Sequence, residues 1–113
     1  MIKKLLFWWK CLFSREKKYS HAFVDDVPDH PDNKIIYLVT HQGYCWQIVM
    51  ICPCGCRKLL YMNAIIDHVP YWRFEIHGKH NVSLHPSIHR QVGCKSHFFV
   101  RRGKIDWCKQ LLL

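Results

Sequence analysis

The hydrophobic and polar positions along the chain follow two different periods. Over Ile2–Lys18, apolar side chains placed at 100° per residue fall on one broad face and most lysines gather on the other, which predicts an amphipathic helix. From Ile35 onward, short runs of β-branched and aromatic residues are separated by turn residues, which predicts strands. These strands are expected at Ile35–His41, Cys45–Ile51, Lys58–Ile65, Trp72–His77, Val82–Leu84, His97–Arg102 and Lys104–Trp107.

The segment between these two patterns, Asp25–Asn33, contains two prolines and four aspartates. This composition opposes any regular element and predicts a linker. The fold class that follows is mainly β, a small antiparallel β domain with an N-terminal amphipathic helix. A chain of 113 residues suits one domain, so we expect a helical appendage over residues 1–20 and a β domain over residues 21–113.

The net charge of +9 is distributed unevenly along the chain. The first 18 residues hold six basic residues and one acidic residue, a net of +5, so the predicted helix could contact an anionic membrane surface or a nucleic acid. Packing of this helix on its own domain, or a frayed chain end, is the interpretation that we favour over these contacts. A second basic stretch, Arg101–Lys104, lies beside aromatic residues, as in proteins that stack bases. A strand with one buried and one solvated face shows the same alternation, and we favour the strand.

Three of the seven cysteines lie within five residues, at Cys52, Cys54 and Cys56. A disulfide framework does not need this close spacing, because a bridge requires specific Cα separations and Cβ directions. Thiolates on a tight turn can instead converge on one Zn²⁺, and Pro53 and Gly55 allow the backbone to bend around it. The run therefore predicts a zinc site, which would help to stabilise a domain of this small size.

The remaining ligands are expected in the run Cys-Lys-Ser-His that ends at His97. Two separated turns that share one Zn²⁺ cross-link two hairpins, as in a zinc ribbon. The candidates outnumber the positions of one tetrahedral site, so His97 is a ligand only if one cysteine is surplus. Two ions that share the ligands, and a catalytic ion with an open water position, are less favoured alternatives. The candidate ligands are Cys52, Cys54, Cys56, Cys94 and His97, with Cys108 as a sixth.

The cysteine total is odd, and clustered thiols are typical of a reducing compartment. The apolar run over Met1–Phe13 is interrupted by Lys10 and is not followed by a small-residue cleavage site. It is also shorter than the about 20 apolar residues of a membrane-spanning helix. We therefore expect a cytoplasmic protein.

If four cysteines bind the zinc, His97 is left as a free imidazole beside a rigid turn. A neutral imidazole is the usual general base near pH 7, and a serine hydroxyl becomes a nucleophile when such a base takes its proton. Three serines lie near this histidine in the sequence, at Ser83, Ser87 and Ser96. Ser87 is the preferred nucleophile, because Pro86 before it has a fixed φ and would present the hydroxyl on a rigid turn.

The group that would orient His97 is left open between Asp67, Asp106 and a backbone carbonyl. If His97 were itself a zinc ligand, this catalytic scheme would lose its base. The remaining candidate bases would then be His85 and His89, and each of these is better interpreted as a surface residue than as a base.

Four motifs together resemble one bacterial family. They are Cys-Pro-Cys-Gly-Cys at 52–56, Tyr-Trp-Arg at 71–73, Ser-Leu-His-Pro-Ser-Ile at 83–88 and Gly-Cys-Lys-Ser-His-Phe-Phe-Val-Arg-Arg-Gly-Lys-Ile-Asp-Trp-Cys at 93–108. From about Ala22 to Cys108, the chain resembles the domain-of-unknown-function family 6527. Members of that family look like small zinc proteins encoded beside ubiquitin-like proteins and their activating-type and conjugating-type enzymes.

The resemblance implies a serine peptidase that processes or removes a bacterial ubiquitin-like protein, with that protein and its conjugation enzymes as partners. The competing hypothesis is a non-catalytic, zinc-ribbon-like binding module whose basic face or helix recruits a protein or a nucleic acid. The polar positions of this chain that match the family's motifs are Ser83, Ser87, Ser96 and His97.

Overall fold

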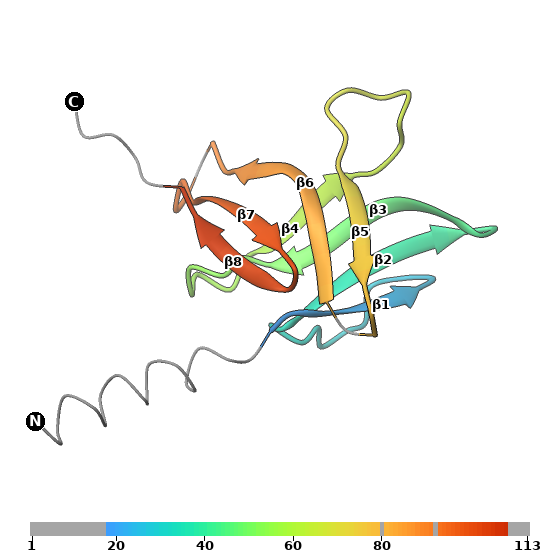
Figure 1. Ribbon diagram of the computed structural model, residues 1–113, viewed down its shortest axis with the longest axis horizontal. Coiled ribbons are helices and arrows are strands. Elements are labelled where there is room, and N and C mark those ends of the chain that lie inside the picture. The colour runs from blue at the N-terminus through green and yellow to red at the C-terminus, as the bar shows by residue number, and fades with distance from the viewer. Residues whose placement is uncertain (1–17, 80, 92, 109–113) are drawn as a thin grey trace, which may run out of the picture.

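The computed structural model describes residues 18–79, 81–91 and 93–108 of the chain. Within these residues the protein is mainly β, as predicted, with eight strands in two four-stranded sheets (Figure 1). The predicted helix at Ile2–Lys18 lies outside the described residues except for its last residue. No helix in the described part of the chain has the length and apolar character needed to cross a membrane. The strands are β1 (Ser20–Val24), β2 (Ile35–His41), β3 (Tyr44–Ile51), β4 (Leu59–Asn63), β5 (Arg73–His77), β6 (Asn81–His89), β7 (His97–Arg101) and β8 (Lys104–Trp107).

Sheet A holds β1, β2, β3 and β4 in that order. β2, β3 and β4 pair antiparallel, whereas β1 pairs with β2 in parallel, with Ser20 opposite Ile35. The predicted antiparallel pairing therefore holds in both sheets except at this edge, and β1 has no counterpart among the predicted strands. The parallel pair forms because residues 25–34 return along the sheet before β2 begins, a path that the short pattern of β1 does not encode.

The segment between β1 and β2 has no regular structure, as its prolines and aspartates predict. It is nevertheless packed on the protein, because Val27 lies against a second buried cluster on the outer face of sheet A. The N–H of Asp32 donates a hydrogen bond to the hydroxyl of Tyr37 at 2.7 Å. The buried members of this cluster are Tyr37, Val39 and Val49.

Sheet B is an antiparallel meander of β5, β6, β7 and β8. The prediction of a short strand at Val82–Leu84 that stops near Pro86 is wrong, because β6 continues to His89. Residues 85–87 form a bulge between the paired residues Leu84 and Ile88. A proline has no N–H to donate to a ladder, and a bulge is one of the few places in a strand that tolerates it.

The inner faces of both sheets form one hydrophobic core between the layers. Along β7, buried residues alternate with more exposed ones, as expected for a strand with one face on a core. The opposite face of sheet B is thereby left for polar side chains. The fully buried core side chains are Ile36, Leu38, Ile48, Met50, Val82, Leu84, Phe98 and Val100.

The described chain enters the fold at Tyr19, directly before β1. The Tyr19 side chain is 3% exposed, and its backbone N–H donates to the carbonyl of Gly103 at 2.7 Å. Gly103 has a φ of +78°, and a Cβ at this position would lie 2.8 Å from the carbonyl oxygen of Tyr19. Glycine is therefore required here, and this contact ties the start of sheet A to the β7–β8 turn of sheet B.

Candidate functional site

The cysteine turn, residues 52–58, connects β3 to β4. Its two ends are held together by the N–H of Cys52, which donates to the carbonyl of Lys58 at 2.8 Å. Within the turn Gly55 has a φ of +99°, a backbone conformation that residues other than glycine rarely adopt. Pro53 restricts φ on the other side of the bend. Pro53 and Gly55 therefore bend the turn, as the sequence predicts.

Four cysteine sulfur atoms converge beside this turn. The Sγ atoms of Cys52, Cys54, Cys56 and Cys94 all lie within 4.8 Å of one another. Cys52 Sγ is 3.4 Å from Cys54 Sγ and 3.6 Å from Cys94 Sγ. Four Zn–S bonds of about 2.3 Å in a tetrahedron place the sulfurs about 3.8 Å apart. The donor set and its spacing therefore fit Zn²⁺.

The surroundings of the cluster favour thiolates at its exposed side. The Arg90 guanidinium donates to Cys94 Sγ at 3.0 Å and to Cys56 Sγ at 3.3 Å. A hydrogen bond with the Ser96 hydroxyl lowers the pKa of Cys94 to about 6, whereas burial raises the pKa of Cys52 to about 11. A cation among the four sulfurs would deprotonate such a thiol outright, and Arg90 would offset part of the negative charge.

The cluster joins the two sheets of the protein. Three of its cysteines come from the β3–β4 turn of sheet A, and Cys94 comes from the β6–β7 loop of sheet B. That loop is closed by the N–H of Arg90, which donates to the carbonyl of Ser96 at 2.8 Å. Within the described residues, the other candidate ligands His97 and Cys108 lie outside the group. A metal at this position would fix the β6–β7 hairpin against sheet A.

A serine–histidine pair lies on the outer face of sheet B beside this hairpin. Ser87 lies in the β6 bulge and His97 begins β7, and Ser87 Oγ is 3.0 Å from His97 Nε2. Both side chains are half-buried. Because a bulge redirects the side chains of its strand, Ser87 can meet the ring of His97 and still face solvent.

The other two candidate serines are buried and hydrogen-bonded elsewhere. Ser83 is 4% exposed, lies 2.9 Å from His77 Nε2 and accepts a hydrogen bond from the N–H of Arg102 at 2.8 Å. Ser96 is 9% exposed, and its hydroxyl is 3.0 Å from a sulfur of the cysteine cluster. Among the three candidates, only Ser87 combines a histidine partner with access to solvent.

The ring of His97 stacks on His89, with 4.4 Å between the ring centroids and 16° between the planes. Asp106, one candidate for the orienting group, forms an ion pair with Arg101 instead, and Asp67 is exposed. Within the described part of the chain no carboxylate forms a hydrogen bond with His97. The described side chains that contact the His97 ring are thus the stacked His89 ring and the Ser87 hydroxyl.

Trp72 also belongs to this site, although the sequence did not single it out as a site residue. The predicted strand Trp72–His77 has Trp72 as its first residue, whereas β5 begins at Arg73. The indole Nε1–H of Trp72 donates to the carbonyl of Ser87 at 3.2 Å. Its membership of the Tyr-Trp-Arg motif at 71–73 was the available signal, and the motif alone does not reveal the partner.

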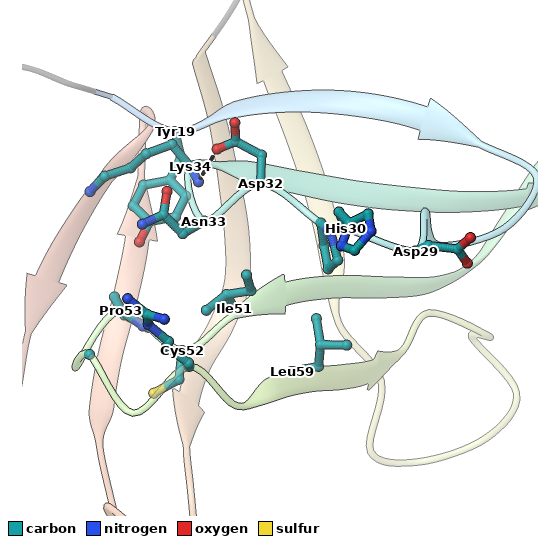
Figure 2. A pocket seen from close by; sticks show the side chains of 13 residues that line it. Tyr19, Asp29, His30, Asp32, Asn33, Lys34, Ile51, Cys52, Pro53 and Leu59 are labelled. Carbon is teal, nitrogen blue, oxygen red and sulfur yellow. Dashed lines mark hydrogen bonds between the residues drawn. The ribbon is translucent and has the colours of Figure 1, made fainter.

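A groove of about 860 Å³ lies between the cysteine turn and residues 29–34 (Figure 2). Ile51 and Pro53 line it on one side, and residues 29–34 line it on the other. Neither Ser87 nor His97 lines this groove. The serine–histidine pair is therefore a separate site on the outer face of sheet B.

A family model described as bacterial ubiquitination-like system serine protease (BubE) matches residues 23–108. The chain belongs to this family. Comparison with curated proteins and with solved structures found no match. The matched part contains the cysteine cluster, Ser87 and His97. The match confirms the expected association with a bacterial ubiquitin-like system but does not support the family number 6527.

Membership of the BubE family also decides between the two classes of function that the sequence left open. The family is a serine protease family of a bacterial ubiquitination-like system, which confirms the peptidase hypothesis and not the non-catalytic binding module. The description of the family names neither catalytic residues nor a metal. The roles of individual side chains rest on the geometry of this chain.

Proposed function

We propose that the protein is a zinc-stabilised serine peptidase that cleaves at the tail of a bacterial ubiquitin-like protein, with Ser87 as the nucleophile and His97 as the general base. The observation that carries this assignment is the 3.0 Å separation between Ser87 Oγ and His97 Nε2. A nucleophile and its base are expected within hydrogen-bond reach, about 2.6–3.2 Å. Ser83 and Ser96 are too buried to meet a substrate carbonyl.

During formation of the acyl-enzyme, His97 accepts one proton from Ser87 and donates one proton to the leaving group. With its own proton on Nδ1, His97 accepts the hydroxyl proton of Ser87 at Nε2 while Oγ attacks the substrate carbonyl carbon. The carbonyl electrons move to the oxygen and then return, which breaks the bond to the leaving group. His97 donates its Nε2 proton to that leaving group, and an ester on Ser87 remains.

Hydrolysis of this ester regenerates the enzyme by the same steps in reverse order. His97 takes a proton from a water molecule, whose oxygen attacks the acyl carbon. When the tetrahedral species collapses, Ser87 Oγ leaves and regains its proton from His97. The released product carries a free carboxylate at its tail. The stacked His89 ring would keep His97 in the same plane through both half-reactions.

The four clustered cysteines would hold the zinc. Four thiolates fill a tetrahedral site and leave no position for water, so the ion would supply a cross-link between the sheets. The β6–β7 loop that carries Cys94 lies between Ser87 and His97 in the sequence, and fixing this loop holds both ends of the serine–histidine pair. The ligands in this proposal are Cys52, Cys54, Cys56 and Cys94.

The partners in this proposal are the ubiquitin-like protein and the enzymes that conjugate it. The conjugation enzymes attach the modifier, and the peptidase matures its tail or removes it. The six cysteines that the structure describes form no disulfide bond with one another. Because a reducing compartment maintains such thiols, we place the protein in the cytoplasm.

The decisive experiment compares three serine variants on one substrate. The substrate is the ubiquitin-like protein of the same system, fused through its C-terminus to a fluorescent protein. We expect Ser87→Ala to abolish cleavage, whereas Ser83→Ala and Ser96→Ala retain it in proportion to their folded fraction. A fluorophosphonate probe should label the parent at Ser87, as located by peptide mass spectrometry. Parental cleavage by Ser87→Ala would overturn the assignment.

A further inference from the structure

We propose that the loop between β4 and β5, residues 64–71, is a docking site for the folded part of the ubiquitin-like substrate. This inference rests on the proposed peptidase function and adds to it the surface that recognises the substrate. The loop presents three large apolar side chains to solvent. Ile65, Ile66 and Val69 are 39%, 67% and 86% exposed. Clustered apolar side chains on a soluble surface are typical of an interaction site.

Asn63 holds this loop in one defined shape. Its Nδ2 lies 2.6 Å from the carbonyl oxygen of His68 and 3.1 Å from that of Pro70. Its Oδ1 accepts the N–H of Ile65 at 3.0 Å, and the N–H of His68 donates to the carbonyl of Ile65 at 3.1 Å. The inward backbone groups are thus paired, and the apolar side chains are held outward. A preformed surface of this kind loses little conformational entropy on binding.

The loop is directly connected to the nucleophile. The next residue, Trp72, closes the loop, because its backbone N–H donates to the carbonyl of Asn63 at 2.8 Å. The indole of the same residue donates to the carbonyl of Ser87 at 3.2 Å. Figure 1 shows the loop running from the end of β4 to the start of β5, the edge strand of sheet B. A small protein seated on the loop would therefore have its tail within reach of Ser87.

The chemistry of the loop indicates a protein occupant. Residues 64–71 include one carboxylate, Asp67, and no lysine or arginine, although the chain has a net charge of +9. Nucleic acids and anionic membranes are bound through basic side chains, and this loop has none to offer. An exposed cluster of aliphatic side chains instead suits the apolar patch of a folded protein. Contacts of this kind, remote from the cleaved bond, let a peptidase select one small protein by its surface as well as its tail.

The test separates docking from chemistry by using substrates of two sizes. The variant is Ile66→Ser with Val69→Ser, and the matched control is Tyr44→Ser, which removes a 79% exposed side chain at the β2–β3 turn. We expect the double variant to react with a small fluorophosphonate at the parental rate. Its kcat/KM on the ubiquitin-like fusion should fall by about tenfold or more, mainly through KM, as for loss of interface anchors. The control should match the parent in both assays.

A binding measurement keeps the two proposals distinguishable. In a Ser87→Ala background, calorimetry with the intact ubiquitin-like protein should show about tenfold weaker binding for the loop variant and no change for Tyr44→Ser. Parental affinity and cleavage in the loop variant would overturn docking, whatever happens at Ser87. If Ser87→Ala itself cleaves the substrate, the peptidase assignment fails. The docking proposal is then tested by the calorimetric affinities alone.

The remaining outcomes concern the integrity and the self-association of the variants. Thermal unfolding should show the same midpoint for the loop variant and the parent, because both replaced side chains face solvent. If the midpoint falls, the single variant Val69→Ser is used in the same assays. A dimer of the parent that the loop variant loses in sedimentation would assign the loop to self-association and overturn docking.

Discussion

The outer face of β6 carries two serine–histidine pairs with nearly the same separation between the hydroxyl oxygen and the ring nitrogen. Ser83 Oγ is 2.9 Å from His77 Nε2, and Ser87 Oγ is 3.0 Å from His97 Nε2. The first pair joins β6 to β5, and the second joins β6 to β7. By distance alone, either pair could be a nucleophile and its base.

The environments of the two pairs differ because the strand is regular at one and bulged at the other. Ser83 lies in the regular ladder opposite Glu75, and its oxygen also accepts the N–H of Arg102. Glu75 Oε1 lies 3.5 Å from His77 Nε2, the same nitrogen that contacts the Ser83 hydroxyl. The carboxylate and the hydroxyl therefore share one ring nitrogen. Ser87 lies in the bulge and faces solvent. Under the proposed assignment, the β6 bulge, and not the length of the contact, would separate the reactive pair from the structural one.

The largest effect should come from removing the hydroxyl of the half-buried pair, Ser87 and His97. We expect Ser87→Ala to lower kcat by about 10³-fold or more, as for loss of a catalytic serine. Ser83→Ala should stay within about threefold of the parent, because its hydroxyl does not reach the substrate. Initial rates on the ubiquitin-like fusion measure both. Equal losses in the two variants would erase the distinction between the pairs.

Replacing the histidines should give the next largest difference. His97→Gln removes the base and is expected to lower kcat by about 10²–10⁴-fold, whereas His77→Gln should retain parental turnover if it remains folded. Elemental analysis should find one zinc per chain in both variants. Loss of zinc from His97→Gln alone would make His97 a ligand and would remove it from the catalytic scheme.

Loss of the metal should affect the Ser87–His97 pair through the hairpin that carries it. Structural zinc contributes on the order of 10 kcal/mol to the folding of small zinc domains, so Cys94→Ser or strong chelation should lower the unfolding midpoint and fluorophosphonate labelling together. Cys108→Ser is the matched control, because this cysteine lies outside the cluster. A chelated protein that keeps both its midpoint and its labelling rate would disprove the zinc cross-link.

A smaller effect is expected from the indole that holds the bulge. Trp72→Phe removes one hydrogen bond to the carbonyl of Ser87 while keeping an aromatic ring, and a net loss of about 1 kcal/mol corresponds to about fivefold in kcat. KM should not change. Trp107→Phe is the control, since Trp107 is an exposed tryptophan on β8. The same loss in both variants would indicate general destabilisation instead of positioning.

The smallest effect on activity should accompany a clear effect on stability. Ser83→Ala leaves the N–H of Arg102 and the ring of His77 without a partner, so its free energy of unfolding should fall by about 1–3 kcal/mol. Ser87→Ala should change this free energy by no more than about 0.5 kcal/mol, as for a solvent-facing position. Urea denaturation measures both. The opposite order would reverse the roles assigned to the two pairs.

Most of the fold could be predicted because it is encoded in local patterns. The strands at Ile35–His41 and Lys104–Trp107 were predicted with their exact bounds, and the strand at 44–51 within one residue. β1 was missed, because its parallel partner is reached only through the long connection of residues 25–34. β6 was cut short at Pro86, because sequence alone does not show that a bulge would accept the proline.

Some features of the candidate site could likewise be predicted from local sequence, and others could not. The turn with three cysteines was evident from spacing, since Pro53 and Gly55 lie between the ligands themselves. The sequence favoured four cysteines as ligands and Ser87 as the partner of His97, but it could not exclude His97 as a ligand or Ser83 and Ser96 as its partners. These outcomes depend on how far one strand is shifted past another.

The sequence by itself determined which residues could bind a metal, where most strands run and which three serines were worth testing. These are properties of short segments, set by side-chain period, turn residues and thiol chemistry. The tertiary structure decided which serine meets which histidine, and it brought Trp72 to the carbonyl of Ser87. The physical reason is that the register and the bulge of β6 are fixed by the packing of two whole sheets, which no single segment contains.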